Sequence, residues 1–273
     1  MLWIGGPPAS GKTTIATRLA RRHGLRLYSA DTRTWVHRDR AIRAGDAAAR
    51  KWESLTPVER WERSTPAEML DMSLHGARGP MVLDDVRALP RSPLIIAEGS
   101  PVPAAAVTSG TIDRTRAVWL LPTAEFQRAR LDAAGTIDGH ARLYRDLRAV
   151  IEREARDNDV ATLTIDGAMD VAEMTIAVER LFADPLSRGP RAETHTERQA
   201  LLREMNDAAI EQIRGYHERP WAGGNPETIA RAFVCECGRP SCEATVVVTV
   251  GEAATRRPFA PAHTPRADTT MEK

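Results

Sequence analysis

The stretch GPPASGKT, residues 6–13, decides how this chain folds. It fits the pattern G-x-x-x-x-G-K-[ST], whose backbone N–H groups wrap a nucleotide phosphate. The context also fits, because the apolar run Leu2–Gly5 predicts a strand before the motif and the pattern from about Thr13 predicts an amphipathic helix after it. We therefore expect an anion site at a helix N-terminus, where the partial positive charge of the helix favours phosphate.

The lysine of this motif is hard to attribute to chance. Of the 38 Lys and Arg residues, only Lys12, Lys51 and Lys273 are lysine. We expect Lys12 to bridge the β- and γ-phosphates of ATP and the Thr13 hydroxyl to ligate Mg²⁺. The expected nucleotide-binding set is Gly6, Pro7, Pro8, Ala9, Ser10, Gly11, Lys12, Thr13 and Thr14. The alternative is a glycine-rich turn that precedes a helix without binding anything.

Up to residue 183, short apolar runs alternate with amphipathic stretches, which predicts an α/β domain with a parallel sheet. Leu94–Ala97 is apolar throughout and should be a central strand. An insertion of about 60 residues separates the second and third strands, a length that is typical of a segment covering a site. We expect it to be helical, because Thr56 and Thr65 each begin a Thr-Pro-x-Glu start signal. The other expected strands are 25–28, 117–121 and 160–165, and the expected helices include 124–134, 141–157 and 171–183.

In this setting, residues 6–13 resemble the phosphate-binding loop of P-loop NTPases, in particular that of small ATP-dependent kinases of the adenylate, shikimate and gluconate kinase type. The resemblance covers about residues 1–183. It implies a five-stranded parallel sheet in the order 2-3-1-4-5, flanked by helices, with a mobile lid that carries arginines. It also implies an enzyme that transfers the γ-phosphate of Mg-ATP to a hydroxyl of a small molecule.

Two carboxylates follow predicted strands of this domain. Glu98 ends the apolar run beside the motif and could hold Mg²⁺ through water; the alternative is an acid that faces solvent. Asp31 follows the second strand, and kinases that resemble this chain carry an aspartate there as the general base for the acceptor hydroxyl. The alternative for Asp31 is an N-cap of the next helix.

Arginines crowd two segments. Arg33, His37, Arg38 and Arg40 lie in the loop of Asp31, where they could bind an anionic or hydroxyl-rich acceptor, although at least two of them should belong to a solvated helix face.

In the second segment, Arg142, Arg145 and Arg148 recur every three residues after Gly135 and Gly139, as a closing lid would require. We expect Arg142 and Arg145 to stabilise the transferred phosphoryl group. An exposed arginine-rich helix is the alternative.

The C-terminal third has a different pattern. Residues 184–195 contain prolines and a glycine without apolar periodicity and predict a linker. Residues 196–265 predict a small α+β module, with a helix over 196–217 and a hairpin of 232–237 and 244–250. Residues 266–273 should be a mobile tail.

All three cysteines lie on this hairpin, at Cys235, Cys237 and Cys242. Three thiols within eight residues predict a structural Zn²⁺ site, with His263, or otherwise His217, as the fourth ligand. The segment resembles a module of uncharacterised actinobacterial proteins, in which a Pro-Gly-His stretch follows; this chain has Pro-Ala-His. Buried thiols without metal, or a disulfide switch, are the alternatives.

Composition narrows the function classes. Hydrophobic residues make up 42% and charged residues 27%, and the net charge is +1, which favours a globular protein over a disordered chain or a polyanion-coating protein. No apolar run approaches the roughly 18 residues of a membrane span, and no secretory signal is evident, so we expect a cytoplasmic protein. The expected partner is a small-molecule acceptor, without membrane or nucleic acid. Two alternatives stay open: a nucleotide-gated regulator with a protein partner on the C-terminal module, and a nucleic-acid end kinase.

Overall fold

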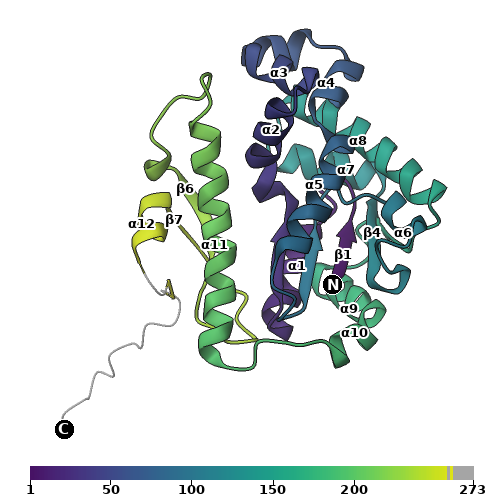
Figure 1. Ribbon diagram of the computed structural model, residues 1–273, viewed down its shortest axis with the longest axis vertical. Helices are drawn as coiled ribbons and strands as arrows, with labels where there is room; N and C mark the ends of the chain where they lie inside the picture. The colour runs from purple at the N-terminus through teal and green to yellow at the C-terminus, as the bar shows by residue number, and fades with distance from the viewer. Residues whose placement is uncertain (257–258, 261–273) are drawn as a thin grey trace.

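A computed structural model describes residues 1–256 and 259–260 of the chain. Five parallel strands form the main sheet, in the order β2-β3-β1-β4-β5. Figure 1 labels the neighbouring strands β1 and β4 of this sheet. The predicted order 2-3-1-4-5 is confirmed. The bounds of these strands are Leu2–Gly5 (β1), Arg26–Ser29 (β2), Ile95–Glu98 (β3), Ala117–Pro122 (β4) and Thr162–Ile165 (β5).

Helices cover both faces of this sheet, and each face has its own apolar core. Side chains of β1, β3 and β4 alternate between the two cores, as the period-two geometry of strands requires. One face packs against α5 (His75–Ala88), α6 (Ala105–Thr108) and α8 (Asp138–Asp157). The other packs against α1 (Lys12–His23), α9 (Val171–Leu181) and α10 (Ala183–Arg188). The strand–loop–helix unit of the sequence motif therefore lies at the centre of a three-layer domain.

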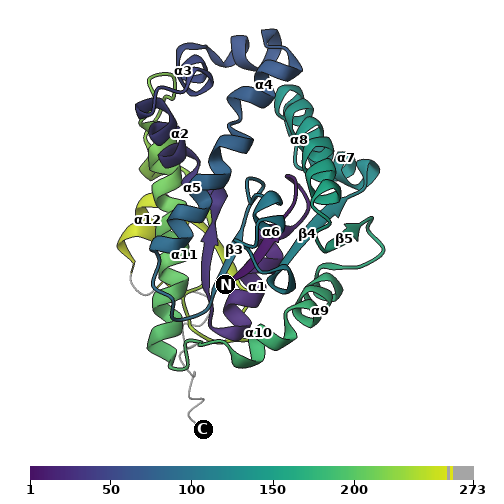
Figure 2. The same ribbon diagram turned by 45° about the vertical axis from the view of Figure 1, so that its right-hand side comes forward.

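The insertion between β2 and β3 is helical, as the start signals predict. Thr65 forms a capping box with Glu68 at the start of α4 (Pro66–Met72). Thr56 and Glu59 exchange the same pair of contacts before a π-helical turn, η2 (Glu59–Arg63). The preceding elements are η1 (Ala30–Arg33), α2 (Thr34–Arg43) and α3 (Ala47–Ser54). These helices rise above the carboxyl edge of the sheet, opposite the upper part of α8 (Figure 2).

The remaining segments of this domain are η3 (Arg114–Arg116) and α7 (Ala124–Ala133). No helix in the described part of the chain is long and apolar enough to span a membrane.

The C-terminal segment is built around one long helix, α11 (His195–His217), which runs beside the sheet domain (Figure 1). The strands β6 (Ala230–Val234) and β7 (Thr245–Thr249) pair antiparallel, which confirms the predicted hairpin with shorter strands. They are accompanied by η4 (Pro226–Thr228) and α12 (Val250–Thr255). A small core of Ile210, Phe233, Val250, Ala253 and Phe259 holds these elements together.

The predicted linker begins as a helix. Residues 183–188 form α10, and Pro185 lies in its first turn, where the missing N–H of proline breaks no helical hydrogen bond. Leu186 is buried in the sheet core, and the Leu94 N–H donates to the Pro190 carbonyl at 2.7 Å. The proline that suggests a break in the sequence therefore begins a short helix, and the segment is packed against the sheet.

The junction between α9 and α10 supplies a test of the core. Phe182 is fully buried and Leu181 beside it is 50% exposed. We expect Phe182→Ala to lower the free energy of unfolding by about 3–5 kcal/mol, because a large apolar side chain leaves a cavity. Leu181→Ala should change it by no more than about 0.5 kcal/mol. Urea unfolding followed by circular dichroism measures both, and equal effects would contradict the packing described.

Candidate functional site

The glycine-rich loop between β1 and α1 is held in a curled conformation by positive φ angles at Gly6 (133°), Ala9 (67°) and Gly11 (84°). A Cβ on Gly6 would lie 2.3 Å from the Leu120 carbonyl oxygen, so only glycine fits there. Gly11 caps α1 without any side-chain hydrogen bond, which leaves the first N–H groups of the helix without a side-chain acceptor. The loop thus has the geometry of an anion cradle.

Lys12 is buried beneath this cradle. Its Nζ donates a 2.9 Å hydrogen bond to the Pro7 carbonyl oxygen, across the loop. Ser10 Oγ is buried and has no hydrogen-bond partner among the described residues. A cation and an unpaired hydroxyl inside the loop are both suited to bind phosphate oxygens.

Glu98 is fully buried at the end of β3, so the alternative of a solvent-facing acid does not hold. Its Oε1 accepts from Thr13 Oγ1 at 3.2 Å and also from Ser29 Oγ. Its Oε2 is buried without a partner. Burial, and then the neighbouring Asp31 carboxylate, raise the pKa of Glu98 to about 7. The Glu98 carboxylate, whose Oε2 has no partner among the described residues, and the Thr13 hydroxyl offer oxygen ligands of the kind that Mg²⁺ prefers.

Asp31 lies on η1 and is exposed, at the edge of a cavity of about 460 Å³. Pro8 of the loop lines the same cavity. Asp31 does not cap the next helix, since the N-cap of η1 is Ser29 and that of α2 is Arg33. Asp31 therefore lines a cavity that reaches the phosphate loop, a position that suits a general base.

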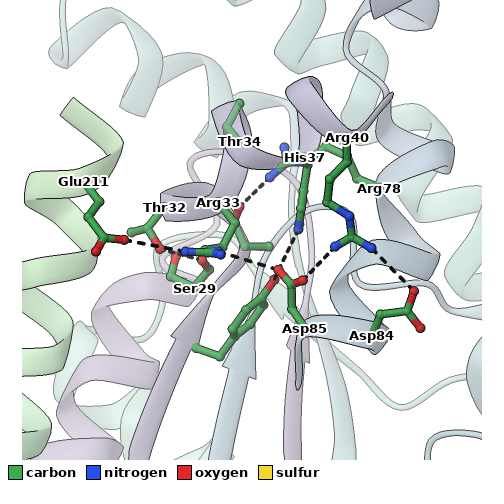
Figure 3. Close-up of polar contacts among 12 residues, drawn as sticks. Ser29, Thr32, Arg33, Thr34, His37, Arg40, Arg78, Asp84, Asp85 and Glu211 are labelled. Atoms are coloured by element: carbon green, nitrogen blue, oxygen red, sulfur yellow. Dashed lines mark hydrogen bonds and ion pairs between the residues drawn. The ribbon is translucent and has the colours of Figure 1, made fainter. Parts of the chain in front are cut away.

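Asp85 of α5, a residue that the sequence analysis missed, separates the four candidates near Asp31 into those that contact it and one that does not (Figure 3). The Asp85 carboxylate contacts His37 Nε2 at 2.9 Å and accepts from Arg40 Nη1 at 2.8 Å, and Arg33 Nε lies 3.6 Å away. Burial lowers the pKa of His37. Three of the four cationic candidates thus brace the loop, and only Arg38 lines the cavity.

Gln127 on α7 is a second residue that the sequence analysis missed. It is fully buried, and its Nε2 donates to the Pro8 carbonyl at 3.0 Å and to the Tyr144 carbonyl at 3.1 Å. It therefore ties the phosphate loop to α8. The sequence held one sign that Gln127 is buried: it lies four residues before Leu131, which places both residues on the same side of α7.

The predicted lid is a packed helix here. Arg142 Nη2 donates to the Trp61 carbonyl, while Arg145 is exposed, and neither forms a hydrogen bond or ion pair with the phosphate loop in the described structure. Gly139 lies inside α8, where a Cβ would come within 2.6 Å of Trp61 Cβ. Close packing against the insertion, rather than hinge freedom, explains this glycine.

The three cysteines come together as predicted. The sulfur atoms of Cys235, Cys237 and Cys242 all lie within 4.8 Å of one another, and all three residues are buried. Burial raises the pKa of the Cys235 thiol to about 12, which disfavours a reactive redox thiolate. His217 does not join this group, and His263 lies outside the described residues.

Several solved kinase structures are similar to this chain. Shikimate kinase from Acinetobacter baumannii in complex with shikimate is 18% identical, with 67% of this chain and 92% of that chain covered, at a TM-score of 0.38. Shikimate kinase from Bacteroides thetaiotaomicron is 17% identical (66% and 95% covered, TM-score 0.34). Deoxyadenosine kinase from M. mycoides with bound dATP is 13% identical (66% and 99% covered, TM-score 0.35).

No protein-family model and no curated protein sequence matches the chain. The strand order of the parallel sheet, β2-β3-β1-β4-β5, is the order that the resemblance of the phosphate-binding loop implies.

The buried Glu98 predicts a pH dependence of stability in the absence of metal and nucleotide. Its pKa is about 7 in the folded chain against an ordinary value of 4.5, so the folded chain keeps a proton that the unfolded chain releases. The free energy of unfolding should therefore fall as the pH rises from 4.5 to 7, by about 3 kcal/mol from this group. Glu98→Gln should lack this fall. Urea unfolding of both proteins in EDTA across this range measures it, and parallel curves would contradict it.

Proposed function

We propose that this chain is a phosphotransferase that moves the γ-phosphate of Mg-ATP to a hydroxyl of a small molecule. The observation that carries the proposal is a juxtaposition. The anion cradle of residues 6–13, the hydrogen bond from Thr13 to the buried Glu98, and Asp31 meet at one end of the sheet, beside a cavity that Pro8 and Asp31 line. A cavity of about 460 Å³ suits a small molecule.

The residues of the cradle would hold ATP. Backbone N–H groups between Gly6 and Thr14 would bind the phosphates, and Lys12 would exchange the Pro7 carbonyl for phosphate oxygens. The Thr13 hydroxyl and Glu98 would hold Mg²⁺, directly and through water. When bound, the ion neutralises negative charge on the phosphates.

Asp31 would act on the acceptor. Its carboxylate would accept the hydroxyl proton as the acceptor oxygen forms a bond to the γ-phosphorus. The bond between that phosphorus and the β–γ bridging oxygen breaks, and the electron pair leaves with ADP. The phosphorylated acceptor and the protonated Asp31 complete the balance.

Arg142 and Arg145 remain the candidates for stabilising the transferred phosphoryl group. Arg142 would first have to release the Trp61 carbonyl, so its contribution requires a rearrangement between α8 and the insertion. Arg145 is exposed and would need no such release.

The two internal lysines provide a matched pair for testing the proposal. Lys12→Ala should abolish transfer from γ-labelled ATP to a small-metabolite extract, with a loss of at least about 100-fold, because the lysine charge acts on the transferred phosphate. Lys51→Ala should retain transfer, because Lys51 forms an exposed ion pair with Glu68. The labelled product, identified by mass, names the acceptor.

Three outcomes would contradict the proposal. Full transfer by Lys12→Ala would remove the motif from the chemistry. Tight nucleotide binding with no labelled small molecule would favour a nucleotide-gated regulator. Label that appears only on polynucleotide ends would favour a nucleic-acid kinase.

We further propose that Cys235, Cys237 and Cys242 hold a structural zinc ion. Their thiols already lie within 4.8 Å of one another and are buried, as a closed site requires. Arg21 on α1 donates to the Cys235 carbonyl at 3.1 Å and to the Ala244 carbonyl at 3.0 Å. A metal here would thus stiffen the hairpin at its junction with the helix that follows the phosphate loop.

Metal content provides the test. The full chain, purified without chelator, should contain about one zinc ion per molecule by plasma mass spectrometry, and Cys242→Ser should lose it. Ser241→Ala is the control, because this neighbour is exposed and offers no thiolate. Loss of zinc from His263→Ala but not from His217→Ala would identify the fourth ligand. Chain purified in zinc-containing medium that holds no zinc would exclude the site.

A further inference from the structure

The C-terminal segment contributes to the lining of the cavity beside Asp31. Gln212 and Tyr216 on α11, and Trp221 after it, line the cavity together with residues of the insertion and of α8. The ring centroids of Trp221 lie 5.8 Å from Trp35 and 5.4 Å from Tyr216. One wall of the proposed acceptor site therefore comes from outside the sheet domain.

Aromatic rings make up much of the other walls. Trp52 and Trp61 pack edge to face at 5.2 Å, and Trp61 stacks on His140 of α8 at 3.7 Å. These residues line the same cavity, as does Tyr144. Rings on several sides favour a flat, ring-bearing ligand.

Two buried arginines are set into these aromatic walls. Arg60 lies over the Trp221 ring at 3.9 Å and Arg38 over the Trp52 ring at 4.5 Å. Arg38 is 3% and Arg60 is 1% exposed. Among the described residues, Arg38 donates to one backbone carbonyl, that of Met72, and Arg60 to one, that of Leu55.

Several buried hydrogen-bond donors of the cavity walls have no acceptor among the described residues. Nε and Nη1 of Arg38, Nε of Arg60 and Nε1 of Trp52 are buried and have no hydrogen-bond partner in the part of the chain that the structure describes. Gln212 Oε1 is the contrasting case, a buried acceptor without a donor. Burying a donor without a partner destabilises the structure, so a ligand that brings oxygen acceptors would offset a deficit already present in the cavity.

The charges point the same way. Neither Arg38 nor Arg60 forms an ion pair within the described residues. Glu53, whose charge acts on both, already accepts from Trp221 Nε1 at 2.8 Å and lies 3.4 Å from Arg219 Nη1. Burial lowers the pKa of Arg38 to about 10, the mark of a cation without adequate compensation. An anionic group on the ligand would supply the missing counter-charge.

The C-terminal wall is also fixed in place. Arg219 forms a two-point contact with the Asp39 carboxylate, at 2.5 and 2.9 Å. Arg33 Nη1 lies 3.6 Å from Glu211 on α11 (Figure 3). The wall is therefore bound to α2 and to the loop that carries Asp31.

We infer that the acceptor is an aromatic acid: its ring lies among the tryptophans, its carboxylate or other acidic group binds Arg38 and Arg60, and the segment from α11 to Trp221 selects it by lining the cavity. The inference rests on the proposed phosphotransfer, because it names the substrate class of that reaction.

Three matched probes test it on the full chain. 4-Hydroxyphenylacetate carries a ring, an acid and a hydroxyl; 4-hydroxyphenylacetamide lacks the acid; 4-hydroxycyclohexylacetate lacks the aromatic ring. Titration calorimetry without ATP should show the first binding at least about tenfold more tightly than either of the others, since a charged hydrogen bond contributes about that factor. Equal affinities, or no binding of any probe at millimolar concentration, would overturn the inference.

Variants then locate the site. Arg60→Gln and Trp221→Leu should each weaken 4-hydroxyphenylacetate by about tenfold or more while leaving ATP affinity unchanged, which also shows that the variants fold. Arg63→Gln is the matched control, because Arg63 is exposed on the same helical turn as Arg60. Full affinity in Trp221→Leu would remove the C-terminal segment from the site. Tight binding of the acid with no transfer from Mg-ATP would overturn the phosphotransfer and leave the anion site standing.

Discussion

The contact on which this structure depends is the buried carboxylate of Glu98, shared between the hydroxyls of Thr13 and Ser29. The sheet order places β3 between β1 and β2, so Glu98 is in register with Ile4 on one side and with Ser29 on the other. The phosphate loop that follows β1 and the Asp31 turn that follows β2 therefore meet at one acid. A fully buried carboxylate is costly unless a proton or a cation neutralises it, which is the physical basis of the Mg²⁺ role proposed for Glu98.

The C-terminal segment has two roles in this arrangement. It braces the sheet domain, through Arg21 from α1 to the cysteine hairpin and through Arg219 to Asp39. It also contributes Tyr216 and Trp221 to the cavity. Both roles depend on the same long helix, which joins the hairpin and the cavity wall in one packed segment. A zinc ion on the hairpin would strengthen this brace without touching the chemistry.

The sequence predicted the parts of the site that local patterns encode. The loop motif, the sheet order and the Thr65 capping box depend on spacing within a few residues of one another or on a family resemblance. Asp85 and Gln127 were not predicted, because each acts on segments that only the tertiary fold brings near: His37 lies 48 residues from Asp85, and Pro8 lies 119 residues from Gln127. Gly139 was predicted to be a hinge, because the sequence does not distinguish a glycine that allows close packing of two helices from a glycine that gives the backbone freedom to move.

Arginine shows why composition could not identify the acceptor site. Nearly every cation of this chain is arginine, so an arginine-rich segment by itself carries little information. The structure separates them by what their donors contact. Arg40 and Arg33 are satisfied by Asp85, and Arg142 has a carbonyl partner. Arg38 and Arg60 differ from these in position, because both are almost fully buried and each lies over a tryptophan ring that lines the cavity. Neither guanidinium forms an ion pair within the described residues, and an anionic ligand would offset the cost of burying their charge.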